Sequence, residues 1–222
     1  MIVHLDIETL PPDVTDPLWI RSYDRAVARA ESRGEDAPDV WVHRTAGALD
    51  PALGRICTIC VALDDDSEPV LIDGTDEGAA FGTLDAERRM LRLLNGGLAL
   101  VGGSIVWHGH NVAHFDAPFI QFRAMVHGSR GALINRFGRL DRKPWEGPFL
   151  DTNDLTPSTG RGAALDAIVG ALGIAQQDGA MGGDVYAAYL RGDFGSIRHH
   201  NVEDVRQCRA LSRILRNIMD AR

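Results

Sequence analysis

The sequence predicts a single α/β domain, residues 1–222, built on a mixed sheet. Short apolar strands gather early in the chain, and helical segments mix in later. No internal repeat or low-complexity linker divides the 222 residues. The 45% of hydrophobic and 24% of charged residues are typical of a globular protein with a sizeable core.

The first strand is expected at residues 1–7, where an apolar run ends shortly before two prolines. Residues 11–53 are interpreted as an insertion that contains one helix at about 18–32. Residues 55–63 and 69–74 follow as two strands, and the acidic turn between them predicts a β-hairpin.

The rest of the chain alternates helices with two further strands. Apolar spacing predicts a helix at 85–94, whose early acids suit the helix dipole, and another at 115–128, which Gly128 ends. The remaining expected elements are strands at 103–111 and 148–155, short helices at 163–174 and 183–193, and a last helix with Ser196 as its N-cap.

Charge and hydropathy narrow the class of protein. The formal net charge of −8 disfavours a protein that coats nucleic acid non-specifically. With no apolar run of about 18 residues and no basic signal-peptide start, we expect a soluble, cytoplasmic protein. Residues 121–143 are locally basic, with one acid, Asp141. Their basic side chains are Arg123, Arg130, Arg136, Arg139, Arg142 and Lys143.

The three cysteines fit a reducing compartment better than a disulfide framework. Cys57 and Cys60 form a CxxC within a predicted buried strand, where residues three apart face opposite sides. Because a metal or redox pair needs both thiols on one side, we interpret this CxxC as structural, with Cys208 on a helix.

Two acids stand two positions apart on the first strand. Asp6 and Glu8 therefore project from the same face. Carboxylates side by side repel and raise each other's pKa unless a cation lies between them. The alternative to a metal site is that these two acids simply face solvent at the edge of a strand, because so short a pattern often arises by chance.

The stretch HNVAHFDAPFI joins a strand to a helix. Asp116 begins the helix, where it could hold a metal, and Phe115 packs beneath it. Three neighbouring histidines, His108, His110 and His114, superficially resemble a zinc site. No cysteine or further histidine follows at finger-like spacing, so zinc is not favoured.

The stretch RHHNVEDV places two histidines ahead of an acid on the last helix. At about 100° per residue, His200 lies on the same face as Asp204, whereas His199 is turned off that face. Taken alone, the pair could be an ordinary i, i+4 contact that stabilises the helix by roughly 0.2–0.5 kcal/mol.

Together, these acids resemble a known set. Asp6, Glu8, Asp116 and Asp204 follow the order of the four acids in the DEDD superfamily of 3′–5′ exonucleases. DIET resembles the first motif, and NVAHFDAPFI and HNVEDV are similar to the second and third motifs of the proofreading domains of family B DNA polymerases. ALDPALGRI and LDAIVGALGI resemble a stand-alone branch of that group. The likeness spans most of the chain and is weakest in residues 11–45.

This resemblance implies a ribonuclease H-like fold, with a mixed five-stranded sheet flanked by helices, and 3′–5′ exonuclease activity. It implies two divalent cations, Mg²⁺ or Mn²⁺: Asp6 bridges both, Glu8 and Asp204 hold the first, and Asp116 holds the second. The expected reaction is hydrolysis of single-stranded DNA from its 3′ end, with release of nucleoside 5′-monophosphates.

The third motif departs from the family at the catalytic base. Members with histidine place it five residues before the last acid, which selects His199. Members with tyrosine place theirs four residues before, which selects His200. The flanking residues and the second motif are of the tyrosine type, so the resemblance favours His200, an imidazole that could take a proton at neutral pH.

Substrate contacts are expected beside these acids. Asn111 and Phe115 are candidates for contacting the terminal nucleotide, and the basic segment for following the substrate backbone. We expect salt-sensitive binding and a replication or repair partner that delivers the substrate. Asp151 and Glu87 are expected to make structural hydrogen bonds. An exoribonuclease, a catalytically silent nucleic-acid-binding module and a ribonuclease H-like endonuclease are the alternatives.

Overall fold

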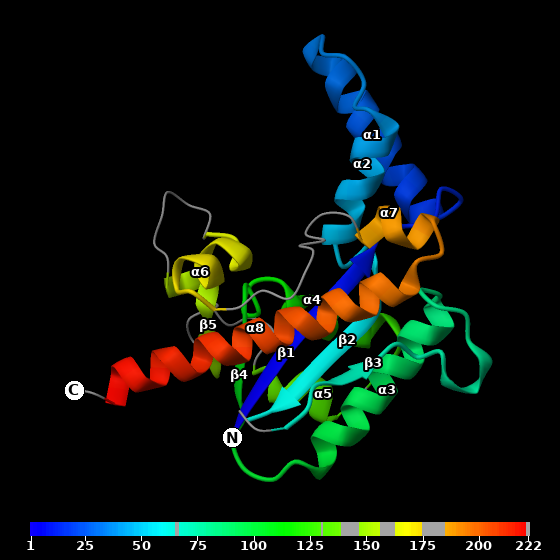
Figure 1. Ribbon diagram of the computed structural model, residues 1–222. Coiled ribbons are helices and arrows are strands. Elements are labelled where there is room, and N and C mark those ends of the chain that lie inside the picture. Colours follow the sequence, from blue (N-terminus) through cyan, green and yellow to red (C-terminus); the bar gives the residue numbers. More distant parts are fainter. Residues whose placement is uncertain (65–66, 130, 139–146, 156–162, 175–184, 221–222) are drawn as a thin grey trace.

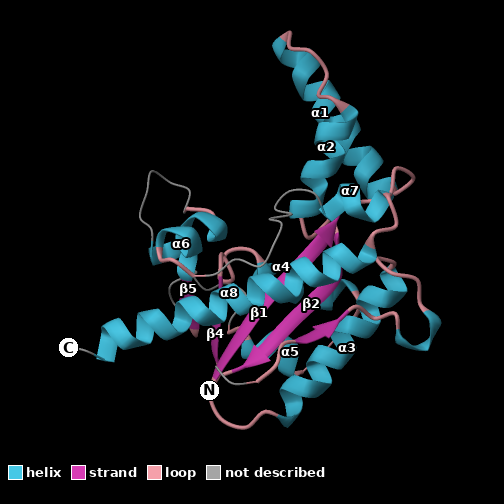
Figure 2. Ribbon diagram, in the orientation of Figure 1, coloured by secondary structure: helices cyan, strands magenta, loops and turns pink. Residues whose placement is uncertain are grey.

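A computed structural model of the chain describes residues 1–64, 67–129, 131–138, 147–155, 163–174 and 185–220. Its strands are β1 (Ile2–Leu10), β2 (Arg55–Leu63), β3 (Val70–Ile72), β4 (Val106–Gly109) and β5 (Phe149–Asp151). They form one sheet in the order β3-β2-β1-β4-β5 (Figure 2). β1–β2 and β2–β3 are antiparallel pairs, and β1–β4 and β4–β5 are parallel pairs. The predicted mixed, five-stranded ribonuclease H-like sheet is confirmed.

Helices cover both faces of this sheet. They are α1 (Pro17–Arg33), α2 (Val40–Ala46), α3 (Leu84–Leu100), α4 (Asp116–Val126), α5 (Ala132–Arg136), α6 (Leu165–Ala171), α7 (Val185–Leu190) and α8 (Phe194–Asp220). Short 3₁₀ turns lie at Gly47–Leu49, Asp76–Gly78 and Thr152–Leu155. Figure 1 shows α8 lying across one face of the sheet. In the described part of the chain, no helix combines the length and apolar character needed to cross a membrane.

The central strand β1 has two different faces. Val3, Leu5 and Ile7 point into the main hydrophobic core, which they share with side chains from α3, α4 and α5. The alternate residues point the other way, and Leu10 packs with Ile197 of α8. The residues between the core positions of β1 therefore face α8.

The insertion between β1 and β2 forms an arm of two helices that projects from the end of the sheet (Figure 1). One helix was expected there, and it is α1, whose first turn is capped by Asp16. The second helix, α2, was missed. It begins where the Asp39 side chain accepts a hydrogen bond from the Val42 N–H at 2.9 Å.

The start of α8 differs from the prediction. The helix begins at Phe194, so Ser196 lies inside it and is not the N-cap. The Asp193 carboxylate accepts hydrogen bonds from the Ser196 hydroxyl (2.7 Å) and backbone N–H (3.2 Å). These bonds lower the pKa of Asp193, which caps the helix in place of the serine.

The two thiols of the CxxC lie on the same side of the sheet, so the expectation of opposite faces was wrong. The pairing of β1 with β2 shifts register between Glu8 and Thr9, and the bulge gives β2 one extra residue, Cys57. Cys57 and Cys60 consequently both pack against apolar side chains of α8. Burial raises the pKa of Cys60 to about 12, and both thiols are free, which agrees with a structural role.

Candidate active site

The first two acids of the site lie on β1. Asp6 and Glu8 alternate with the core residues of this strand and point toward α8, where each meets a side chain of that helix. This confirms that they share one face. Both side chains are half-buried, so the central strand of the sheet presents two adjacent carboxylates beneath a helix.

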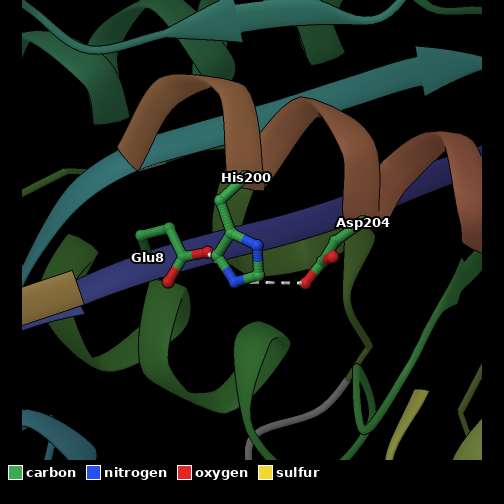
Figure 3. A group of neighbouring side chains, drawn as sticks. All are labelled: Glu8, His200 and Asp204. Carbon is green, nitrogen blue, oxygen red and sulfur yellow. Dashed lines mark ion pairs between the residues drawn. The ribbon is translucent and has the colours of Figure 1, made fainter. Parts of the chain in front are cut away.

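Helix α8 supplies an imidazole and a third acid. His200 Nε2 lies 3.5 Å from Glu8 Oε1 and 3.7 Å from Asp204 Oδ2 (Figure 3). The two α8 residues are one helical turn apart and project from the same face, as their spacing predicted. His199 is exposed, while His200 is largely buried between the two carboxylates.

Asp116 brings the fourth carboxylate to β1. It is the first residue of α4, it is 2% exposed, and its Oδ1 accepts a hydrogen bond from the Ile7 N–H at 2.9 Å. Because Ile7 lies between Asp6 and Glu8, this bond holds the start of α4 beside both acids. Phe115 packs against the main core next to Phe119, as expected.

The pKa of each of the four carboxyl groups is raised, and for Asp204 the repelling acids, Glu203 and Asp166, lie outside this set. Burial is the largest cause for each of them, and repulsion from the neighbouring acids adds to it. Together these effects raise the pKa of Asp116 to about 8. Burial also raises the pKa of Asp204, and the nearby His200 imidazole opposes that shift. Within the described residues, the ion pairs of these acids are those of Glu8 and Asp204 with His200.

This set of donors fits hard divalent cations. Mg²⁺ and Mn²⁺ prefer carboxylate oxygens, and these four side chains offer oxygens on three different elements. One ligand atom each from Glu8, His200 and Asp204 lies within 4.8 Å of the others, which is close enough to share an ion. The carboxylates that repel one another are therefore those that a cation would bring together.

Asn201 was missed from the sequence. It is fully buried, and its Nδ2 donates a hydrogen bond to Asp6 Oδ2 at 2.5 Å. Asn201 stands three residues before Asp204, so helix spacing places both on one side of α8. That spacing is the available signal, but an amide is not a typical ligand for Mg²⁺, so the sequence alone does not mark Asn201 as part of the site.

Asp151 fixes the loop that leads to Asp116. Its carboxylate accepts hydrogen bonds from the backbone N–H groups of Asn111 (2.7 Å), Ala113 (2.8 Å) and Asn153 (2.9 Å). This confirms its structural role. Asn111, a candidate substrate contact, adopts the left-handed conformation with φ of 66°, and Asn153 Nδ2 donates to its side-chain oxygen at 3.4 Å.

Two arginines of the basic segment are part of the fold. Arg123 is buried, and its Nη2 lies 2.6 Å from Oε2 of Glu87, which also accepts hydrogen bonds from His127 and the Ile56 N–H. Arg136 donates to two backbone carbonyls. Glu87 is thus structural, as expected, but the expectation that Arg123 follows the substrate backbone was wrong, because its guanidinium is buried against Glu87. For Arg136 that expectation stays a prediction. The remaining basic residues of that segment, Arg130, Arg139, Arg142 and Lys143, lie outside the described residues.

The three histidines near β4 do not converge. His108 Nδ1 lies 3.1 Å from Nδ1 of buried His4, and His110 Nδ1 lies 2.9 Å from the Thr152 hydroxyl oxygen. His114 pairs with an exposed carboxylate. Of the groups of possible metal ligands within the described ranges, one contains His114 together with Asp151 and Asp154, and none contains two of these three histidines.

Comparison with known proteins supports the fold. No protein-family model matches the chain, and neither does any curated protein sequence. Among solved structures, the family B DNA polymerase from the hyperthermophilic archaeon Pyrobaculum calidifontis is similar, with a TM-score of 0.59 and 15% identity. The similarity covers 96% of this chain but only 24% of the polymerase, so the chain spans about a quarter of that protein. The architecture described above therefore recurs within a DNA polymerase.

Proposed function

We propose that the protein is a metal-dependent 3′–5′ exonuclease that hydrolyses single-stranded DNA. The observation that carries the proposal is the proximity of four carboxylates from β1, α4 and α8, two of which, Glu8 and Asp204, lie against His200. The likeness to part of a DNA polymerase supports nucleic acid as the substrate class.

The four acids have the chemistry to hold two divalent cations. Asp6, Glu8, Asp116 and Asp204 would bind Mg²⁺ or Mn²⁺, with Asp6 shared between the two ions. When bound, the ions stabilise the attacking and the leaving oxygen of an in-line displacement at phosphorus. Cleavage of the last phosphodiester bond in this way releases a nucleoside 5′-monophosphate and leaves a new 3′ hydroxyl.

His200 is proposed as the group that takes a proton from the attacking water. Its Nε2 lies 3.5 Å from Glu8 and 3.7 Å from Asp204, so a proton accepted there is held between two carboxylates that stabilise the imidazolium. His199 is the competing candidate. Its exposure weighs against it, because a base must be within hydrogen-bond reach of the water it activates.

Asn111 and Phe115 are proposed to contact the terminal nucleotide. Both lie on the segment between β4 and α4, directly before Asp116. A base can stack on an aromatic ring without regard to sequence, which suits an enzyme that removes one nucleotide after another. A replication or repair protein that delivers the 3′ end would complete the proposed assembly.

The proposal is tested with 5′-labelled single-stranded DNA and RNA of the same sequence, incubated with Mg²⁺, Mn²⁺ or EDTA. A stepwise ladder on DNA, lost in EDTA, is the expected result. A ladder on RNA alone would make the protein an exoribonuclease. No product from either polymer would contradict the proposal and favour a silent binding module.

Matched variants tie the activity to the site. Asp6→Ala should abolish the ladder, since it removes the shared ligand. Asp85→Asn is the control, because Asp85 is an exposed acid of α3 whose side chain is 75% accessible and contacts Arg88. A ladder that survives in Asp6→Ala would assign the activity to a contaminating nuclease.

A further inference from the structure

We propose that Asn201 is a positioning residue, which holds the Asp6 carboxylate in the orientation that binds metal. This inference rests on the proposed function. Asn201 lies on α8 beside His200, and its Nδ2 donates to Asp6 Oδ2 across 2.5 Å. The bond connects the first strand of the sheet to the last helix.

The hydrogen bond restricts how Asp6 can turn. Within the described residues, Asn201 is the side chain that donates to this carboxylate. An ionised carboxylate has about four lone-pair positions, and a charge-assisted hydrogen bond fixes one of them. The other oxygen, Oδ1, is left for cations. Because Asp6 is the ligand shared by both ions in the proposed site, rotation of this one group would disturb both.

The other end of the amide indicates what the residue contributes. Asn201 is fully buried, and its Oδ1 has no hydrogen-bond partner among the described residues. A buried polar atom without a partner costs stability. An apolar side chain would avoid that cost, so the benefit of an amide at this position lies in the bond to Asp6.

Two variants separate the hydrogen bond from packing. Asn201→Leu keeps the branched shape of the side chain, though with bulkier ends, and removes the donor. Asn201→Ala removes the donor and the volume, and cannot clash. Ser212→Ala is the matched control. Ser212 is also a fully buried residue of α8, and its hydroxyl oxygen has no partner within the described part of the chain, but it lies two turns beyond Asp204. Thermal melting monitored by circular dichroism checks whether each variant is folded.

Mn²⁺ binding to the protein alone, measured by electron paramagnetic resonance, is the direct readout. Loss of a residue that orients a metal ligand weakens metal binding by about 10–100-fold, so both Asn201 variants should show that increase in Kd. The kcat on single-stranded DNA should fall by a similar factor, with KM for DNA changed by less than about 2-fold. Ser212→Ala should match the wild type in all three quantities.

Several results would overturn the inference. Wild-type Mn²⁺ affinity in both Asn201 variants would do so, as would a loss confined to Asn201→Leu, which would indicate packing. If the wild-type protein binds Mn²⁺ but hydrolyses no DNA or RNA, the proposed function fails while the affinity comparison still decides the role of Asn201. If the wild type binds no Mn²⁺, both proposals are rejected.

Discussion

His199 and His200 are adjacent in the chain but lie in different surroundings. His200 is enclosed by Glu8 and Asp204, whereas His199 is exposed. The helical periodicity of the sequence was enough to predict that difference, because 100° per residue separates neighbouring side chains on any helix. From the sequence alone, the spacing found in histidine-type exonucleases selects His199, whereas the motifs of the tyrosine type select His200. The different burial of the two histidines makes this conflict testable.

His200→Ala should reduce kcat on single-stranded DNA by about 10²-fold or more, as expected when a proton-transfer group is lost. His199→Ala should change kcat by less than about 2-fold, because an exposed side chain away from the acids makes no contact with them. Steady-state kinetics of both variants at one pH provide the measurement. A larger loss in His199→Ala would mean that the histidine register proposed here is wrong.

At the scale of elements, Asp151 at the end of β5 anchors the loop that precedes α4. Asp151→Ala leaves three backbone N–H groups without their acceptor, and each such group costs about 1–3 kcal/mol when it stays buried. We expect the free energy of unfolding to fall by at least about 2 kcal/mol in urea denaturation. Asp154→Ala, at a neighbouring exposed acid, should change it by less than about 0.5 kcal/mol. Equal stability of the two variants would remove the anchoring role of Asp151.

The sequence predicted correctly those features of the elements that depend on neighbouring residues alone. The two-residue period of a strand correctly predicted that Asp6 and Glu8 share one face. The same period failed for Cys57 because a bulge adds one residue to β2, and no local pattern in that strand reveals the bulge. Arg123 was misassigned for a related reason. Its partner Glu87 lies 36 positions away, so the pairing that buries it depends on how α3 and α4 pack.

Over the whole molecule, the site joins β1, α4 and α8 through groups that repel one another. In the metal-free protein, the folded state keeps a proton on Asp116 up to a pKa of about 8, whereas an unfolded aspartate loses it near pH 4. The folded state thus binds more protons than the unfolded state between these values. Its free energy of unfolding therefore falls as pH rises through this range.

The melting temperature in EDTA should therefore be lower at about pH 8.5 than at about pH 7. Burial lowers the pKa of His4 to about 4 and that of His108 to about 3, so these histidines make stability rise with pH, but only below about pH 6.5. The window from about pH 7 to about pH 8.5 avoids this opposite contribution. Mg²⁺ should raise the melting temperature more at the higher pH, because protons no longer compete with it. Asp116→Asn should reduce both effects. A melting temperature that rises with pH in EDTA would contradict this description of the site.

The proposed reaction has a direction and a defined product, and one measurement tests both. Single-stranded DNA carrying a radioactive phosphate only in its last phosphodiester bond is incubated with the protein and Mn²⁺. We predict that the label leaves in the first turnover as a nucleoside 5′-monophosphate, before the rest of the strand shortens. Label that stays on the oligonucleotide while it is cut internally or from the 5′ end would contradict the assignment as a 3′–5′ exonuclease.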